Sequence, residues 1–123
     1  MARNPESGIQ ASIQRFLRQR GWLTERMHGN AYQVGIPDLF AFHKKHGFRW
    51  IDVKVKGKYS FTKGQCQKWT EWEKHDLGVW IMIAASDDEY MKLFQPPNFR
   101  AYWRPSYDKY LRSLDSILDE LTG

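Results

Sequence analysis

Two aspartates and a lysine in the middle of the chain are residue types that support metal-ion chemistry. Asp38 directly follows Gly-Ile-Pro, and Asp52 and Lys54 stand two residues apart in a later segment. If the two segments pair as a hairpin, both carboxylates come within reach of one cation, and carboxylate oxygens suit a hard ion such as Mg²⁺. Lys54 would then project beside that ion, where its charge can stabilise an anionic group.

The same three residues also have an ordinary structural interpretation. An aspartate next to a proline is common in turns. Alternating acidic and basic residues, as at Asp52 and Lys54, are typical of the solvent-facing side of a strand. Spacing alone leaves the catalytic and the structural interpretation open.

The elements that would carry these residues are two strands joined by a turn. The pattern of strand, turn and strand covers residues 38–43, 44–47 and 48–56. Side chains alternate along a strand, so Asp52 and Lys54 share one face, while Ile51 and Val53 share the other. The hairpin therefore predicts an acidic and basic face backed by an apolar one.

A helix is predicted before this hairpin. Asn4 can cap it, Pro5 suits its first turn, and Gly21 marks its end. Glu6 lies on the same side of this helix as the apolar residues Ile9, Ile13, Phe16 and Leu17. Glu6 either complements the helix dipole or points into the interior.

A second helix is predicted after the hairpin. Thr62 is its N-cap and Gln65 follows three residues later, which is the capping-box pattern. The helix is expected to run to about residue 76.

The remaining segments complete an α/β order. We expect a hairpin or two short strands for residues 22–34, a buried strand for 79–85 and a candidate further strand for 89–94. Residues 95–105 are expected to be irregular and residues 106–123 to form an amphipathic helix. Helix, three strands, helix, strand predicts a mixed β-sheet flanked by helices.

Composition and charge narrow the class of partner. The chain of 123 residues has a net charge of +5, and residues 44–74 contain nine basic and three acidic residues. A local excess of this kind favours polyanions as partners. The lone Cys66 excludes an internal disulfide, and no apolar run approaches the ~20 residues of a membrane span. We therefore expect a soluble protein of the cell interior.

Three short motifs together resemble the PD-(D/E)xK nuclease superfamily. They are Gly35-Ile36-Pro37-Asp38, Trp50-Ile51-Asp52-Val53-Lys54 and Phe61-Thr62-Lys63-Gly64-Gln65. The resemblance covers roughly residues 6–85. It is greatest to the small virus-type replication-repair (VRR-NUC) branch, and the chain is also similar to the Holliday junction resolvases of the superfamily. The resemblance implies a restriction-endonuclease-like core in a single domain, residues 1–123.

The resemblance also implies a metal site. Asp38 and Asp52 would be metal-binding acids, together with the backbone carbonyl of Val53, and Glu6 would be the first-helix acid that completes the site. The expected cofactor is Mg²⁺ or Mn²⁺. The chain departs from the VRR-NUC pattern in having Asp52 where that branch usually has Glu.

Two further residues receive roles from the same resemblance. Lys54 would be the catalytic lysine. Gln65 would correspond to the glutamine of the second helix, which orients water or phosphate near the metal.

The function implied is that of a metal-dependent endodeoxyribonuclease that hydrolyses phosphodiester bonds in branched or structured DNA, as in recombination and repair. Basic residues would contact the phosphates, and Tyr59 and residues 99–104 are candidates for stacking on bases. The DNA-binding candidates are Lys44, Lys45, Lys56, Lys58, Tyr59, Lys63 and Lys68. The alternative is a non-catalytic module that binds structured DNA with a nuclease-like fold.

Partners and location follow from this function. Resolving a junction needs two paired nicks, so we expect a homodimer, with the terminal helix as a candidate interface. DNA is the other expected partner and no membrane is expected. The expected location is the cytoplasm, including that of a host cell if the protein is virus-encoded.

Overall fold

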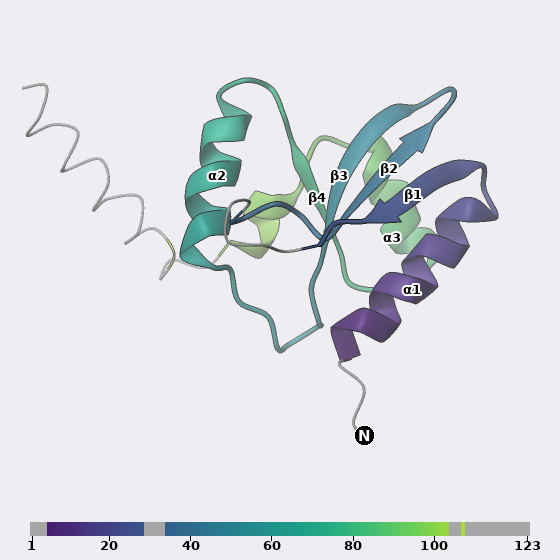
Figure 1. The fold of residues 1–123 in the computed structure, drawn as a ribbon, viewed down its shortest axis with the longest axis horizontal. Helices are drawn as coiled ribbons and strands as arrows, with labels where there is room; N and C mark the ends of the chain where they lie inside the picture. The colour runs from purple at the N-terminus through teal and green to yellow at the C-terminus, as the bar shows by residue number, and fades with distance from the viewer. Residues whose placement is uncertain (1–4, 29–33, 104–106, 108–123) are drawn as a thin grey trace, which may run out of the picture.

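Four strands form one mixed sheet in the part of the chain that is described. The computed structural model describes residues 5–28, 34–103 and 107. The strands are β1 (Trp22–Arg26), β2 (Leu39–His43), β3 (Gly47–Val53) and β4 (Val79–Met82). They lie in the order β1-β2-β3-β4, with β4 parallel to β3 and the other neighbours antiparallel (Figure 1). The α/β class and the mixed sheet are confirmed.

The β2–β3 hairpin sets the relative position of the two aspartates. Leu39 lies opposite Ile51, so Asp38 and Asp52 fall at the same end of the hairpin. β3 ends at Val53 and not at residue 56 as predicted. Lys54 N–H still donates to the Met82 carbonyl at 3.1 Å, and the chain then turns, with Lys58 N–H donating to the Val55 carbonyl at 3.0 Å.

Helices cover both faces of the sheet. They are α1 (Pro5–Arg18), α2 (Lys63–Glu73), α3 (Asp87–Met91) and the 3-10 helices η1 (Lys92–Phe94) and η2 (Phe99–Tyr102). Helix α1 buries Ile13 and Leu17 against one face, in a cluster with Leu39 and Ile51. Helix α2 buries Trp69 against the opposite face, in a separate cluster. In Figure 1, α1 and α2 lie on either side of the strands.

The predicted capping box of α2 is present. The Thr62 hydroxyl accepts a hydrogen bond from Gln65 N–H, and Gln65 Oε1 accepts one from Thr62 N–H, both at 3.1 Å. The helix ends at Glu73, slightly before the predicted residue 76, and Asp76 adopts a left-handed conformation with φ of 60°. The start of α2 is therefore fixed where the loop from β3 arrives.

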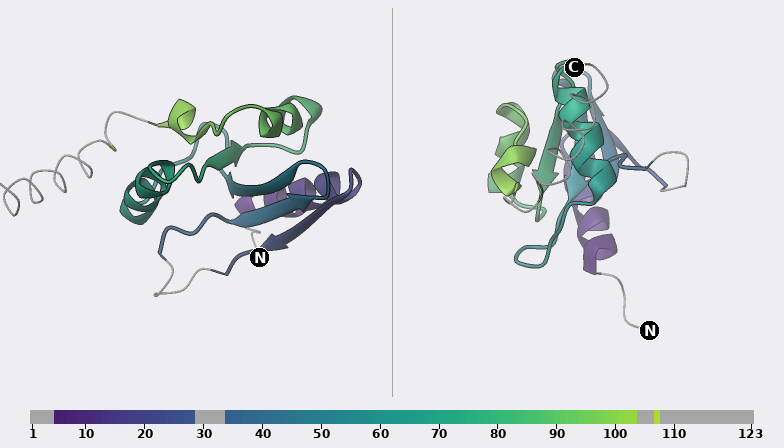
Figure 2. Two further views of the ribbon diagram at one scale, coloured as in Figure 1. Left: turned by 90° about the horizontal axis from the view of Figure 1, so that it is seen from above. Right: turned by 90° about the vertical axis from the view of Figure 1, so that its left-hand side faces the viewer.

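The segment after β4 is helical and folds back along the edge of the sheet. The prediction of a strand at 89–94 is wrong: the Ser86 hydroxyl caps α3 by accepting Glu89 N–H at 3.3 Å, and η1 follows. Asn98 then pairs with β4, since its side chain accepts from Ile81 N–H at 2.7 Å and donates to the Ile81 carbonyl at 3.4 Å. Figure 2 shows this segment, in green, alongside β4.

Other predictions are partly tested. Of residues 22–34, the described part forms the single strand β1, and the irregular segment 95–105 contains η2. The predicted terminal helix, residues 106–123, lies outside the described residues apart from Tyr107, which is buried against Phe61. Within the described ranges, each helix is too short or too polar to cross a lipid bilayer.

Candidate active site

Asp38 and Asp52 hold each other's backbone at one end of the hairpin. Asp52 Oδ1 accepts a hydrogen bond from Asp38 N–H at 3.2 Å, and Asp38 Oδ2 accepts one from Val53 N–H at 2.8 Å. These reciprocal bonds continue the strand pairing by one step beyond Leu39 and Ile51. The two carboxylates predicted from spacing are therefore brought together, with one oxygen of each anchored by the backbone.

The second oxygen of Asp52 faces a lysine. Asp52 is 1% exposed, and its Oδ2 lies 2.9 Å from Lys54 Nζ. Apart from this ion pair, Oδ2 has no hydrogen-bond partner among the described residues. A buried carboxylate oxygen in this state is suited to a cation.

Lys54 is buried and held from several sides. Its Nζ donates to Gln65 Oε1 at 3.0 Å, and the same oxygen accepts from Thr62 N–H. The ammonium also lies 4.6 Å from the centre of the Phe61 ring and 5.8 Å from that of Trp69, in range for cation–π attraction. Gln65 thus links the capping of α2 to the position of Lys54.

Glu6 reaches the site from the first turn of α1. Its carboxyl group interacts with that of Asp38: burial, followed by the charge of Asp38, raises the pKa of Glu6. Gln10 donates to Glu6 Oε1 at 3.4 Å, one turn along the helix. Of the two interpretations of Glu6, the structure supports the one that turns it inward, toward Asp38.

Burial and the repulsion between the two carboxylates make it costly to ionise both Asp38 and Asp52. Burial raises the pKa of Asp38 to about 6, and the neighbouring Asp52 carboxylate adds to the rise. Burial likewise raises the pKa of Asp52, against the opposing effect of the Lys54 ammonium. A bound cation would relieve both effects.

The donor set fits a hard divalent cation in part. Asp38, Asp52 and Glu6 offer carboxylate oxygens, and the main chain of Val53 lies between the acid and the lysine of the same segment. Over the described ranges, no group of three or more His, Cys, Asp or Glu side chains is arranged as a metal cluster. Mg²⁺ commonly takes one or two carboxylates and fills its remaining positions with water and substrate phosphate. The residues fit that mode of binding and not an all-protein cage.

The loop before Asp38 is fixed against α2 by close contact. Gly35 has φ of 86°, and a Cβ there would lie 2.6 Å from the carbonyl oxygen of Gly64. Trp69 Nε1–H donates to the Gly35 carbonyl at 2.7 Å. Sequence reasoning missed Phe61 and Trp69 as neighbours of the site, although both lie within or just after the third motif.

The predicted DNA-binding residues fall into two groups. Lys56 and Lys58 are exposed in the loop that follows the acids, Lys63 is exposed at the start of α2, and Lys68 is half-buried on that helix. Lys44 and Lys45 are exposed in the turn at the other end of the hairpin, roughly 20 Å from Asp38 at about 3.3 Å per residue. The first group therefore follows the acids closely along the chain, in the loop after β3 and on α2, whereas the second lies at the far end of the hairpin.

The predicted stacking residues are engaged in the core. Tyr59 donates its hydroxyl to the Tyr102 carbonyl at 3.1 Å and packs edge-on against Phe61. Phe99 is 1% exposed, and Arg100 forms a paired contact with Glu73. Stacking on a base by Phe99 is therefore wrong, because its ring is inside the second cluster.

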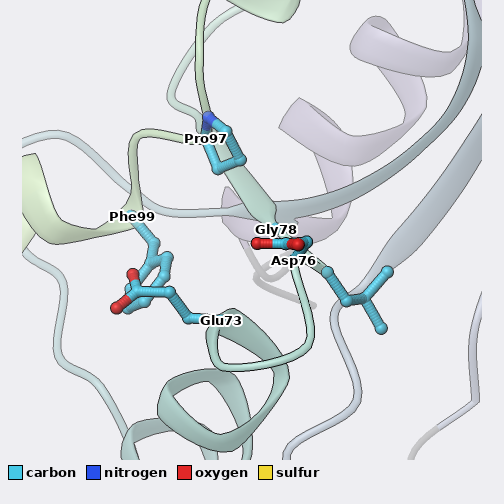
Figure 3. A pocket seen from close by; sticks show the side chains of 6 residues that line it. Glu73, Asp76, Gly78, Pro97 and Phe99 are labelled. Atoms are coloured by element: carbon cyan, nitrogen blue, oxygen red, sulfur yellow. The ribbon is translucent and has the colours of Figure 1, made fainter.

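A cavity of about 220 Å³ lies at the other end of α2. Figure 3 shows Glu73 and Phe99 on one side of it and Pro97 on the other. It is lined by Glu73, Asp76, Leu77, Gly78, Pro97 and Phe99. Because Gln65 marks the opposite end of the same helix, this cavity is separate from the acids.

The comparison with known proteins identifies the fold. No protein-family model matches the sequence, and no curated protein matches it. A solved structure described as "VRR_NUC domain" is similar in fold, with a TM-score of 0.59 and 14% sequence identity, over 73% of this chain and 95% of that one. The chain thus has a VRR-NUC nuclease-like fold of the restriction-endonuclease type, as the motifs predicted.

Proposed function

We propose that this chain is a metal-dependent endodeoxyribonuclease that hydrolyses phosphodiester bonds in branched or otherwise structured DNA. The observation that carries the proposal is the meeting of Asp38, Asp52 and Lys54 through short contacts in a VRR-NUC-like fold. Chance placement of surface residues does not account for a buried ion pair next to reciprocally bonded acids. The whole chain, residues 1–123, would act as one nuclease domain.

The site residues divide into those that hold a cation and those that act on the phosphate. Asp38, Asp52 and the carbonyl of Val53 would bind Mg²⁺ or Mn²⁺, and Glu6 would complete the acidic side of the site. When bound, the cation supplies positive charge that neutralises phosphate oxygens and acidifies water.

Lys54 adds a fixed positive charge where negative charge develops during hydrolysis. A water oxygen adds to the phosphorus, the bond to the leaving oxygen breaks, and that oxygen takes up a proton. A preorganised cation stabilises the charge on the phosphate oxygens during this change. Gln65, which holds Lys54 Nζ at 3.0 Å, acts as a positioning residue and could also orient water or phosphate.

The substrate class follows from charge and size. Lys56, Lys58, Lys63 and Lys68 follow the acids in the loop after β3 and on α2. They would contact phosphates, which gives affinity without sequence information. Cleavage of a four-way junction requires two sites, so the active species would be a homodimer acting as a Holliday junction resolvase in recombination or repair.

The test compares the cleavage of synthetic four-way junctions, flaps and duplexes by wild type, Asp52→Asn and Asp88→Asn. The asparagine of Asp52→Asn keeps an acceptor for Asp38 N–H but loses the charge that holds the cation, so cleavage should fall by at least about 10³-fold. Asp88 is exposed on α3, and its variant should cleave like wild type.

Two outcomes would contradict the proposal. Equal cleavage by wild type and Asp52→Asn would remove the catalytic assignment. Junction binding by wild type with no cleavage in Mg²⁺ or Mn²⁺ would favour the alternative, a non-catalytic module for structured DNA.

A further inference from the structure

One face of the sheet carries aromatic and aliphatic side chains that are open to solvent. Leu23 is 57% exposed, Phe42 47% and Phe48 41%. Their positions are paired across three strands, since Leu23 lies opposite Phe42 and Phe42 opposite Phe48. Phe40 and Trp50, paired on β2 and β3, extend the patch toward the acids. These five residues are the open sheet face.

The rings of the open sheet face are already ordered against one another. Phe40 and Phe48 stack with centroids 5.8 Å apart, and Phe48 meets Trp50 edge-on at 5.2 Å. Trp50 in turn contacts Trp72 of α2, at 5.6 Å. A partner would meet a surface that needs little ordering, which lowers the entropic cost of binding.

The charge on this face does not favour nucleic acid as a partner. By strand alternation the described charged residues on this side of β1, β2 and β3 are Glu25 and the buried Asp52, and there is no Lys or Arg among them. Platforms for single-stranded nucleic acid combine rings with a positively charged groove. In a chain of net charge +5, this is a surface where two copies can approach without bringing strand lysines or arginines face to face.

We propose that the open sheet face is where a second copy of this chain docks. Two apolar sheet faces pack about 10 Å apart in sandwiches. A two-fold axis through such a face makes each surface its own partner and closes the assembly at two copies. The sheet, and not only the terminal helix expected from the sequence, would then form the dimer.

The exposed area is of the right kind for the centre of an interface. At about 200 Å² per large side chain, Leu23, Phe42 and Phe48 leave roughly 300 Å² of apolar surface open per copy. A standard interface buries about 800 Å² per partner, with an apolar centre and a polar rim. The three residues would supply that centre, and the neighbouring strand ends and turn would supply the rim.

Pairing through this face would place two sites at a useful separation. Phe42 is four residues from Asp38 along β2, about 13 Å, so two sites related by an axis near Phe42 would lie on the order of 30 Å apart. That distance is close to one turn of duplex DNA. This consequence rests on the proposed nuclease function, whereas the interface itself does not.

The test measures the mass of the full-length protein by light scattering after size separation, over about a hundredfold range of concentration. Wild type should have twice the chain mass of 14.7 kDa. Phe42→Glu and Leu23→Glu place a charge in the apolar centre and should each give the single-chain mass. Met91→Glu is the matched control, because Met91 is also 57% exposed but lies on α3, which packs on the other face, and it should remain dimeric.

The outcomes separate the interface from the nuclease activity. A single-chain mass for wild type at every concentration, or an unchanged dimer in both sheet variants, would overturn the proposal. Circular dichroism of each variant checks that the fold is kept. Asp52→Asn should be dimeric and inactive, whereas Phe42→Glu should be monomeric and lose paired cuts of a four-way junction. Full cleavage by Asp52→Asn with an intact dimer would thus count against the catalytic assignment and not against the interface.

Discussion

Asp38 and Asp52 each use one carboxylate oxygen to bind the backbone of the opposite strand. The bonds to Val53 N–H and Asp38 N–H keep both acids in place without a cation. The remaining charge lies in a buried setting shared with Glu6 and Lys54. The two aspartates therefore order the backbone at the end of the hairpin and also repel each other when both are ionised. This repulsion has a measurable effect on the stability of the folded protein.

The metal-free protein should lose stability as the pH rises through about 6. The pKa of Asp38 is raised from its ordinary value to about 6 by burial and by Asp52, so the folded state binds a proton more tightly than the unfolded chain. The stabilising effect is complete below pH ~4 and is lost as the pH rises through the folded-state pKa. Thermal unfolding with a chelator at pH 5 and pH 7.5 measures it.

Asp38→Asn is the matched variant for this effect. Asparagine keeps an acceptor for Val53 N–H and cannot ionise, so at pH 7.5 without metal the variant should be more stable than wild type, by about 1–3 kcal/mol. It should also lose the stabilisation that Mg²⁺ or Mn²⁺ gives wild type. A variant less stable than wild type at pH 7.5 would show that the charge at Asp38 is compensated within the protein.

For single residues, the sequence predicted that Asp38 and Asp52 lie close together but did not predict which side chains surround Lys54. The hairpin pattern was enough to bring Asp38 and Asp52 together, since strand register is a local property. The Phe61 and Trp69 rings around Lys54 come from a loop and a helix, and their approach depends on how α2 packs on the sheet. No spacing rule contains that information.

Helix α2 and the loop that precedes β2 form a second layer of positioning. Trp69 on α2 bonds the carbonyl of Gly35, and Gly35 touches Gly64 at the first turn of the same helix. The loop leads directly into Asp38. The Gly-Ile-Pro motif thus acts through packing against the helix.

Gly35→Ala should destabilise the protein more than Gly57→Ala does. Both glycines have positive φ, 86° and 76°, so both variants bear the cost of a left-handed alanine, about 1–2 kcal/mol. The new Cβ at position 35 would also lie 2.6 Å from Gly64 O, whereas none of the atoms considered lies within 4 Å at position 57. We expect an additional loss of about 2 kcal/mol or more for Gly35→Ala in denaturant unfolding. Equal losses would mean that the loop moves freely off α2.

The predicted elements were most reliable where a capping signal was recognised. The Thr62 and Gln65 capping box was found in advance and is present. Residues 89–94 were predicted as a strand because apolar residues are frequent there, although Ser86 and three acidic residues that follow it are a helix-start signal. That signal could have been weighed against the apolar content.

At the scale of the whole molecule, the basic residues of 44–74, all of them described, do not form a single surface around the acids. The predicted cluster at 44–74 is continuous in sequence, but the hairpin carries Lys44 and Lys45 to its far end and leaves Lys56 and Lys58 beside the site. Charge counted along the chain could not show this division. It depends on which way each strand runs.

Two double variants that each remove two positive charges should therefore differ in how much they reduce junction cleavage. Lys56→Ala with Lys58→Ala should reduce junction cleavage at low substrate concentration by about tenfold or more, because the proposed phosphate contacts of both lysines lie in the loop that follows the acids. Lys44→Ala with Lys45→Ala should reduce it much less. Measuring both at two salt concentrations separates local contacts from net charge, and equal losses would favour net charge.

The free edges of the sheet bear on how copies of this protein could associate. A bare edge strand offers its peptide groups to any passing strand, which is the usual start of fibrous growth. On β4, the Asn98 amide occupies both the N–H and the carbonyl of Ile81, so a single side chain imitates the missing neighbour. Open-ended growth along that edge is interrupted at its centre, and association is directed toward contacts that close.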